Sequence, residues 1–397
     1  MSVYSLHGRG LKLDTRADVE PYLREINSEV LEEIHLGGNT IGVEAAQALA
    51  EVLQRASKLR VADFADIFTG RLISEIPQAI SALCDALVDK QHLVEIDLSD
   101  NAFGGRVVDP LVPFLTGNRS FQIFKLNNNG LGPAGGTVIA NALRASAEAS
   151  AKEGKKSNLR VLVCGRNRLE DGSAKEWAAA FKAHGTLEEV RMPQNGIRMD
   201  GIAALAGGLI ANPSLAHLDL QDNTFSQSGE RAFAAALASW PKLHTLNFSD
   251  CVLSDEGEIP TTITALASGS SPALRHLLIQ NNNLDSKTLA VLSEAIGTHL
   301  KGVTRIEFQA NDVEEDDEEM QALMDSMTAR GGRFLFDDEE EEEETGVEDE
   351  EPEAVPLVSS AAAEIERVLG PGARASAGDA EADELAKMLG KVSLNNA

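Results

Sequence analysis

Apolar residues recur along this chain in a fixed order, with polar residues between them. In the stretch 121–132, FQIFKLNNNGLG, the residues fit the pattern Φ-x-x-Φ-x-Φ-x-x-N-x-Φ, where Φ is apolar. The same order begins again at a series of related positions, which are Val3, Leu31, Leu59, Leu93, Phe121, Leu159, Leu187, Leu215, Leu243, Leu274 and Val303. Because these starts follow one another at a nearly constant interval, we interpret the chain as a tandem array of about eleven similar units.

This order is typical of a leucine-rich repeat, in which each unit contributes one short strand and a return segment. Alternation along the first strands places Ile34 and Leu36 in the core and His35 on the opposite face. Apolar residues at three- and four-residue spacing then predict helices, of which the clearest are Val43–Leu53, Gly201–Ile210, Arg231–Leu237 and Lys287–Ile296. The sequence therefore predicts an α/β solenoid, a ribonuclease-inhibitor-like horseshoe with strands on its concave side and helices on its convex side.

An asparagine follows most of the predicted strands, and we call these residues the ladder asparagines. A buried carboxamide has both donors and an acceptor, so it can satisfy backbone groups of its own turn and of the next one. Leaving such groups unpaired costs about 1–3 kcal/mol each. We therefore interpret the set as structural, and its members are Asn39, Asn101, Asn129, Asn167, Asn195, Asn223, Asn282 and Asn311.

Two units depart from the common length. The unit 59–92 has Ile67 where a ladder asparagine belongs, and the unit 121–158 carries the excess segment Ala145–Ser157, which we expect to extend a convex helix. A solenoid needs a cap where its last core face would meet water. We expect a helix near Met320–Thr328 and an edge strand within 331–336 to supply this cap, so that residues 1–336 form one repeat domain.

The C-terminal part of the chain has a different composition. Residues 337–353 contain thirteen acidic and no basic side chains, and self-repulsion predicts that this run is disordered. We expect residues 354–397 to be a flexible tail with short amphipathic helices at Ala361–Leu369 and Ala380–Leu389.

Charge and composition narrow the classes of function. The formal net charge of −28 lies largely in the tail and disfavours binding to nucleic acid or to anionic membranes. Three scattered cysteines favour a reducing compartment, and the sequence has no apolar run long enough to cross a bilayer. The sequence also lacks phosphate-loop, nucleophile-elbow and zinc-protease motifs, so we expect no metal, no cofactor and no active site of its own.

A second column of residues lies one place before the ladder asparagines, and we call it the rim column. Its members are Gly38, Asp66, Asp100, Asn128, Arg166, Gln194, Asp222, Asp250 and Asn281. We expect these side chains to be free of the structural role of the ladder and to face a partner, although an ordinary solvated rim accounts for most of them. Asn128, which lies between Lys125 and Gly130, and the pair Arg166 and Arg168 stand out.

Three strings carry a resemblance to a known family. They are FTGR at 68–71 with EIP at 75–77, NNGLGP at 128–133, and CGRNRLE at 164–170. Together with the repeats and the acidic run, they resemble the GTPase-activating proteins of the small GTPase Ran, and other leucine-rich repeats share only the apolar framework.

The resemblance implies a function and a set of roles. Family members stimulate GTP hydrolysis in trans by holding the GTPase's own catalytic glutamine in place, without an arginine finger. This implies that Asn128 and Arg71 are catalytic and that Arg166 and Arg168 bind the partner. To the partner-binding set we add Lys125, Asp66 and Asp100, which lie near Asn128 or in the rim column.

The resemblance also implies a partner and a location. The expected partner is Ran in its GTP-bound form, with Ran-binding proteins as accessories, and GTP and Mg²⁺ belong to the GTPase. We expect a monomer of the short fungal type that is cytoplasmic and supports nuclear transport, with shuttling through the nucleus left open. The alternative is a non-catalytic leucine-rich repeat inhibitor or scaffold that holds a protein ligand in its concave face.

Overall fold

The structure is a computed structural model that describes residues 2–255, 257–314 and 316–336. Twelve parallel strands form one sheet in the order of the chain. They are β1 (Val3–Ser5), β3 (Glu33–His35), β5 (Val61–Asp63), β6 (Glu95–Asp97), β7 (Ile123–Lys125), β8 (Val161–Val163), β9 (Glu189–Arg191), β10 (His217–Asp219), β11 (Thr245–Asn247), β12 (His276–Leu278), β13 (Arg305–Glu307) and β14 (Arg333–Leu335). A second, two-stranded sheet pairs β2 (Lys12–Leu13) with β4 (Thr40–Ile41).

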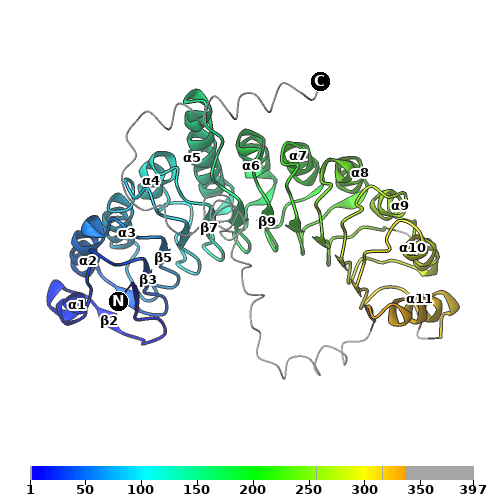
Figure 1. The fold of residues 1–397 in the computed structure, drawn as a ribbon, viewed down its shortest axis with the longest axis horizontal. Helices are drawn as coiled ribbons and strands as arrows, with labels where there is room; N and C mark the ends of the chain where they lie inside the picture. The colour runs from blue at the N-terminus through cyan, green and yellow to red at the C-terminus, as the bar shows by residue number, and fades with distance from the viewer. Residues whose placement is uncertain (1, 256, 315, 337–397) are drawn as a thin grey trace, which may run out of the picture. The chain divides into compact units, whose positions relative to one another are not determined.

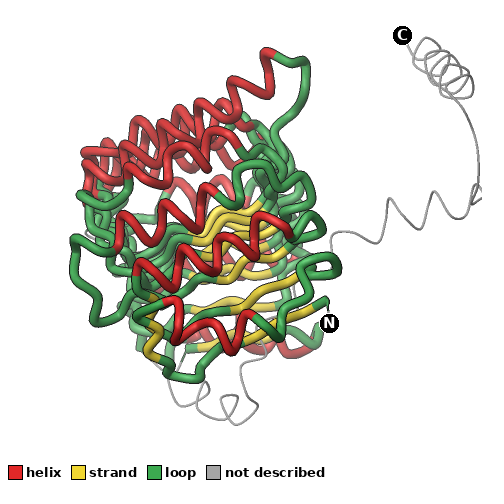
Figure 2. The backbone as a smooth tube through the Cα atoms, turned by 90° about the vertical axis from the view of Figure 1, so that its left-hand side faces the viewer, coloured by secondary structure: helices red, strands yellow, loops and turns green. Residues whose placement is uncertain are grey.

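Helices return the chain from each strand to the next. They are α1 (Arg16–Leu23), α2 (Val43–Arg55), α3 (Ile76–Asp85), α4 (Val112–Gly117), α5 (Gly132–Lys152), α6 (Glu170–His184), α7 (Met199–Leu209), α8 (Ser226–Ala236), α9 (Thr261–Ala267), α10 (Ser286–Gly297) and α11 (Glu318–Ala329), with 3-10 turns at Asp109–Leu111 and Leu237–Ser239. Within residues 2–336 the strands lie on the inner side of an arc and the helices on its outer side (Figure 1). Seen from one end of the arc, the strands run side by side beneath the helices (Figure 2).

The core lies between the sheet and the helices. The middle residue of each strand is buried and aligned with its neighbours, as in the series Ile34, Ala62, Ile96 and Phe124. In α2 the buried residues include Leu49 and Leu53, and burial of each such leucine contributes roughly 1.5–3 kcal/mol. The predicted α/β leucine-rich repeat solenoid is confirmed.

The ladder asparagines have the predicted role. Nδ2 of Asn129 donates to Leu98 O at 3.0 Å and to Asn127 O at 2.9 Å, and its Oδ1 accepts from Asn101 N at 3.0 Å. The expected direction was wrong, because Leu98 and Asn101 belong to the preceding repeat rather than to the next one. Each carboxamide therefore ties its own turn to the repeat before it.

Most predicted elements are present with adjusted ends. Helix α5 extends into the excess segment and ends within it at Lys152, and α11 and β14 occupy the expected cap. Helix α8 begins at Ser226, before the predicted start at Arg231. The sequence pattern missed this first turn because its residues are polar and show no apolar spacing. The β2–β4 sheet was not predicted. The predictions for 337–353 and 354–397 lie outside the described residues.

Candidate functional site

The rim column has a backbone conformation that the sequence pattern did not reveal. Its residues have positive φ, with values of 47° at Asp66, 61° at Asp100, 51° at Asn128 and 54° at Arg166. Glycine, asparagine and aspartate tolerate this left-handed region best. The rim column therefore does have a structural role, contrary to our expectation. The left-handed backbone conformation at these positions explains why Asp and Asn are frequent in the column.

Backbone hydrogen bonds run along the rim from one repeat to the next. The N–H of Asp100 donates to Asn127 O, and that of Asn128 donates to Gly165 O, both at 2.9 Å. Arg166 continues the series, with its N–H 2.9 Å from Pro193 O. The structure thus brings Asp66, Asp100, Asn128 and Arg166 together as successive members of one hydrogen-bonded rim.

The side chain of Asn128 is exposed and has one partner among the described residues. Its Nδ2 donates to Oδ1 of Asp100 at 2.8 Å. The neighbouring Asn129 is fully buried and serves the ladder. The two consecutive asparagines therefore have different environments, one open to a partner and one fixed in the core.

Arg166 and Arg168 are both exposed and lie in the repeat that follows the repeat of Asn128. Both have φ of 54°, which an arginine adopts at a cost of roughly 1–2 kcal/mol. Within residues 2–336, apart from the two undescribed positions, neither guanidinium has a hydrogen-bond or ion-pair partner. The repeat that follows Asn128 thus carries two exposed arginines without a hydrogen-bond or ion-pair partner in the described part of the chain.

Lys125 and Asp66 have neighbours within their own chain. Lys125 projects from β7, and its Nζ lies 2.9 Å from Oε1 of Glu95 on β6. Burial raises the pKa of Asp97, and Lys125 acts in the opposite direction. Asp66 accepts a hydrogen bond from the hydroxyl of Thr69. Contacts of these side chains with a partner remain a prediction.

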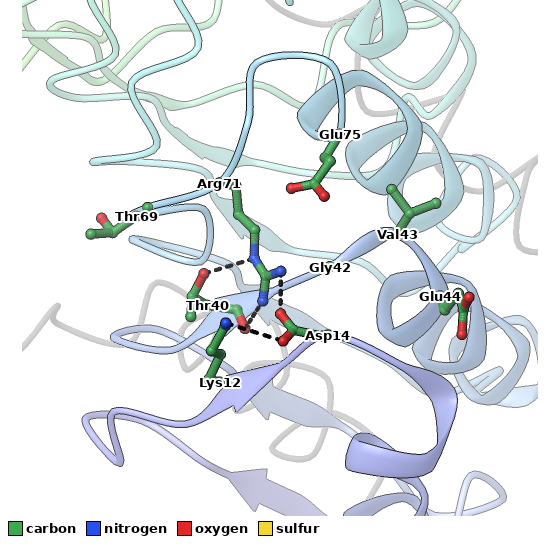
Figure 3. Close-up of a pocket in the computed structure, with 10 residues that line it drawn as sticks. Lys12, Asp14, Thr40, Gly42, Val43, Glu44, Thr69, Arg71 and Glu75 are labelled. Atoms are coloured by element: carbon green, nitrogen blue, oxygen red, sulfur yellow. Dashed lines mark hydrogen bonds and ion pairs between the residues drawn. The ribbon is translucent and has the colours of Figure 1, made fainter.

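The side chain of Arg71 points towards Asp14 and Thr40 of the first two repeats (Figure 3). Its Nε donates to Thr40 Oγ1 at 2.8 Å, its Nη2 donates to Thr40 O at 2.9 Å, and its Nη1 bonds Asp14 Oδ1. The side chain is only 9% exposed. The hydrogen bond from Arg71 holds the pKa of Asp14 below its ordinary value.

A cleft of about 660 Å³ surrounds this contact. A Cβ atom at Gly42 would lie 2.7 Å from Asp14 O and 3.1 Å from Arg71 Nη1, so the close approach requires glycine. The cleft is lined by Lys12, Asp14, Thr40, Gly42, Val43, Glu44, Thr69, Gly70, Arg71 and Glu75. Arg71 thus holds the loop between β5 and α3 of the long third repeat against the β2–β4 sheet.

Sequence reasoning missed four residues near Arg71. Asp14 and Thr40 hold its guanidinium, and they lie 57 and 31 residues away, beyond any local pattern. Leu72 and Ile73 follow it in the chain and are 67% and 62% exposed. Their signal was an apolar pair outside the repeat template, directly after the FTGR string.

Neither a metal site nor a membrane span is found where the structure describes the chain. No group of three or more His, Cys, Asp or Glu side chains in the described ranges is placed to hold a metal ion. No helix among the described elements combines the length and apolar character needed to cross a bilayer.

Comparison with known proteins gives several similarities. A leucine-rich repeat family model matches residues 27–50 and 241–257. The chain is 48% identical over 197 residues to Ran GTPase-activating protein 1 of Xenopus laevis, covering 49% of this chain and 34% of that protein. It is 39% identical over 226 residues to Ran GTPase-activating protein 1 of Saccharomyces cerevisiae, covering 55% of each chain.

A third relative is the ribonuclease inhibitor of Sus scrofa, which is 29% identical over 133 residues, covering 33% of this chain and 27% of that protein. The matched region thus spans between about a quarter and about half of the length of these curated relatives.

Proposed function

We propose that this chain, which has a leucine-rich repeat fold and is similar to Ran GTPase-activating proteins, accelerates GTP hydrolysis by Ran. The observation that carries the proposal is the 48% identity over 197 residues to a protein of that name. The exposed rim amide supports it, together with two arginines in the next repeat that have no partner among the described residues, because these polar groups are available to another protein.

Catalysis of phosphoryl transfer depends on positioning and on stabilisation of charge. The proposed activator supplies positioning: the amide of Asn128 contacts the catalytic glutamine of the GTPase and holds it against the attacking water. An amide suits this contact because it both donates and accepts hydrogen bonds. GTP and Mg²⁺ are brought by Ran, so the activator carries out no reaction on its own.

The surroundings of Arg71 support a mechanism without an arginine finger. A finger must reach the transferred phosphoryl group, whereas the Arg71 side chain is 9% exposed and its guanidinium bonds Asp14 and Thr40. We assign Arg71 the role of holding the first repeats and the exposed loop at Leu72 in position. Its effect on activity then comes through the shape of the docking surface.

The remaining charged residues bind the partner in this proposal. Arg166 and Arg168 attract acidic groups of the GTPase, and Lys125 and Asp66 contribute contacts along the same rim and sheet face. The partner is Ran in its GTP-bound form, with Ran-binding proteins as accessories, and the activator acts as a monomer in the cytoplasm. The acidic residues in 337–397 increase the rate of association by long-range attraction to basic surface on Ran.

The test is a single-turnover assay with Ran preloaded with GTP and substoichiometric amounts of this protein. The proposal predicts that all bound GTP is hydrolysed at an accelerated rate, because each activator molecule serves many GTPase molecules. Tight binding of Ran without acceleration would instead support the alternative of a non-catalytic inhibitor or scaffold. Absence of both binding and acceleration would reject Ran as the partner.

A further inference from the structure

One pair of rim side chains is in direct contact at the candidate site. Nδ2 of Asn128 donates to Oδ1 of Asp100 at 2.8 Å. The backbones of both residues are fixed, since the N–H of Asp100 donates to Asn127 O and that of Asn128 donates to Gly165 O. Both side chains are exposed, yet their separation is set by the repeat framework.

The chemistry of the two groups determines which way the amide faces. An ionised carboxylate only accepts hydrogen bonds, so it attracts the NH₂ group of an amide and repels its oxygen. Asp100 therefore selects the orientation in which Nδ2 of Asn128 faces it. The Oδ1 atom of Asn128 accepts no hydrogen bond from the described part of the chain.

We propose that Asp100 is a positioning residue, which holds the Asn128 amide so that Oδ1 is presented as a hydrogen-bond acceptor to an N–H donor of the partner GTPase. The inference rests on the proposed function and assigns Asp100 a role distinct from partner binding. The donor that fits is a side-chain amide NH₂ or a backbone N–H at the GTPase active site. Asp100 itself acts through Asn128.

The size of the effect follows from the states that the contact removes. A free asparagine side chain has three staggered χ1 wells and two amide orientations, so roughly six arrangements compete. Holding one of them increases the fraction of Ran complexes in which the amide is oriented for hydrolysis by up to about sixfold. Removing the contact should therefore lower the maximal stimulated rate by about three- to sixfold.

The same column offers a matched control pair. Nδ2 of Asn281 donates to Oδ1 of Asp250 at 2.6 Å, and Asp250 has φ of 57°. This pair repeats the Asp–Asn contact at a rim position outside the candidate site. Glycine is the suitable replacement at these positions, because Gly38 already occupies the column with φ of 72°.

The experiment measures the maximal rate of GTP hydrolysis by Ran and the half-saturating concentration separately. Asp100→Gly should lower the maximal rate three- to sixfold and leave the half-saturating concentration nearly unchanged. Asp100→Asn retains an acceptor but allows both amide orientations, so it should lose only about twofold. Asp250→Gly should behave as the unmodified protein, and thermal melts establish that each variant is folded.

A double variant separates positioning from direct contact. In an Asn128→Gly background, Asp100→Gly should cause no further loss, because there is no amide left to orient. Three results would overturn the inference: an unchanged rate for Asp100→Gly, a loss confined to the half-saturating concentration, or a further loss in the Asn128→Gly background. If the unmodified protein does not stimulate GTP hydrolysis by Ran, the proposed function fails. If stimulation depends on Asn128 but not on Asp100, only the present inference is rejected.

Discussion

The division between ladder and rim predicts that adjacent asparagines contribute very differently to stability. Asn129 is fully buried and makes three hydrogen bonds with backbone groups of two repeats. Asn128 is exposed, and among the described residues its side chain makes one hydrogen bond, to Asp100. We consider Asn129→Ala and Asn128→Gly, the second because the φ of 51° is better tolerated by glycine than by alanine.

The expected magnitudes follow from the groups left unpaired. Asn129→Ala leaves the buried N–H of Asn101 without its acceptor, and an unpaired buried group costs about 1–3 kcal/mol. Leu98 O keeps Nδ2 of Asn101 as a donor, and Asn127 O keeps the N–H of Asp100. The loss of unfolding free energy should therefore be at least about 1 kcal/mol. Asn128→Gly removes one solvent-exposed hydrogen bond, and such surface substitutions usually stay within about 0.5 kcal/mol.

Urea unfolding followed by circular dichroism measures the global difference, and hydrogen exchange locates it. Asn129→Ala should shift the urea midpoint down and speed exchange at the N–H of Asn101, which loses its acceptor. Asn128→Gly should leave both unchanged. Equal losses in the two variants, or an unaltered midpoint for Asn129→Ala, would refute the assignment of separate roles to the two columns.

Three further predictions concern the rest of the chain. Arg71→Ala should speed hydrogen exchange in the β2–β4 sheet and reduce stimulation of Ran. Asp14→Ala should have the same two effects if Arg71 acts only through the fold. Loss of activity in Arg71→Ala alone would instead indicate direct contact between Arg71 and Ran. Burial lowers the pKa of His184 to about 4 and of His217 to about 3, so the unfolded chain binds more protons than the folded one below the ordinary value of 6.5. As the pH is lowered from about 6 to about 4, the free energy of unfolding should therefore fall by up to about 1.4 kcal/mol per pH unit for each histidine. Urea titrations across that range should show that the unfolding free energy of His184→Asn depends less steeply on pH. Deleting 337–397 should lower the association rate with Ran at low salt and flatten its salt dependence, measured by stopped flow, whereas an unchanged rate would leave the tail a solubilising role.

The regular part of the fold was predictable because one period governs it. Alternation of apolar and polar residues over three positions identifies strands such as β7. Apolar residues at helical spacing after the strands identify helices such as α2, and both elements are found where expected. The β2–β4 sheet was not predictable, because two-residue strands carry no alternation of their own. The first turn of α8 was missed for a similar reason, since its residues are polar.

The candidate site was less predictable than the fold. Asp and Asn residues in the rim column fit both a partner-facing role and a left-handed backbone, and only the φ values reveal the second reason. The inward orientation of Arg71 depends on residues in two other repeats, so no local pattern indicates it. Arg166 and Arg168 were chosen from a family resemblance, and the structure adds that both are exposed and unpaired within the described residues.

The most direct test of the central claim compares the unmodified protein with Asn128→Gly in single-turnover hydrolysis of Ran-bound GTP at the same substoichiometric concentration. The unmodified protein should accelerate hydrolysis, and Asn128→Gly should lose most of this acceleration while it keeps the same urea midpoint. Equal acceleration by the two proteins would contradict the claim that the exposed rim amide positions the active site of the GTPase.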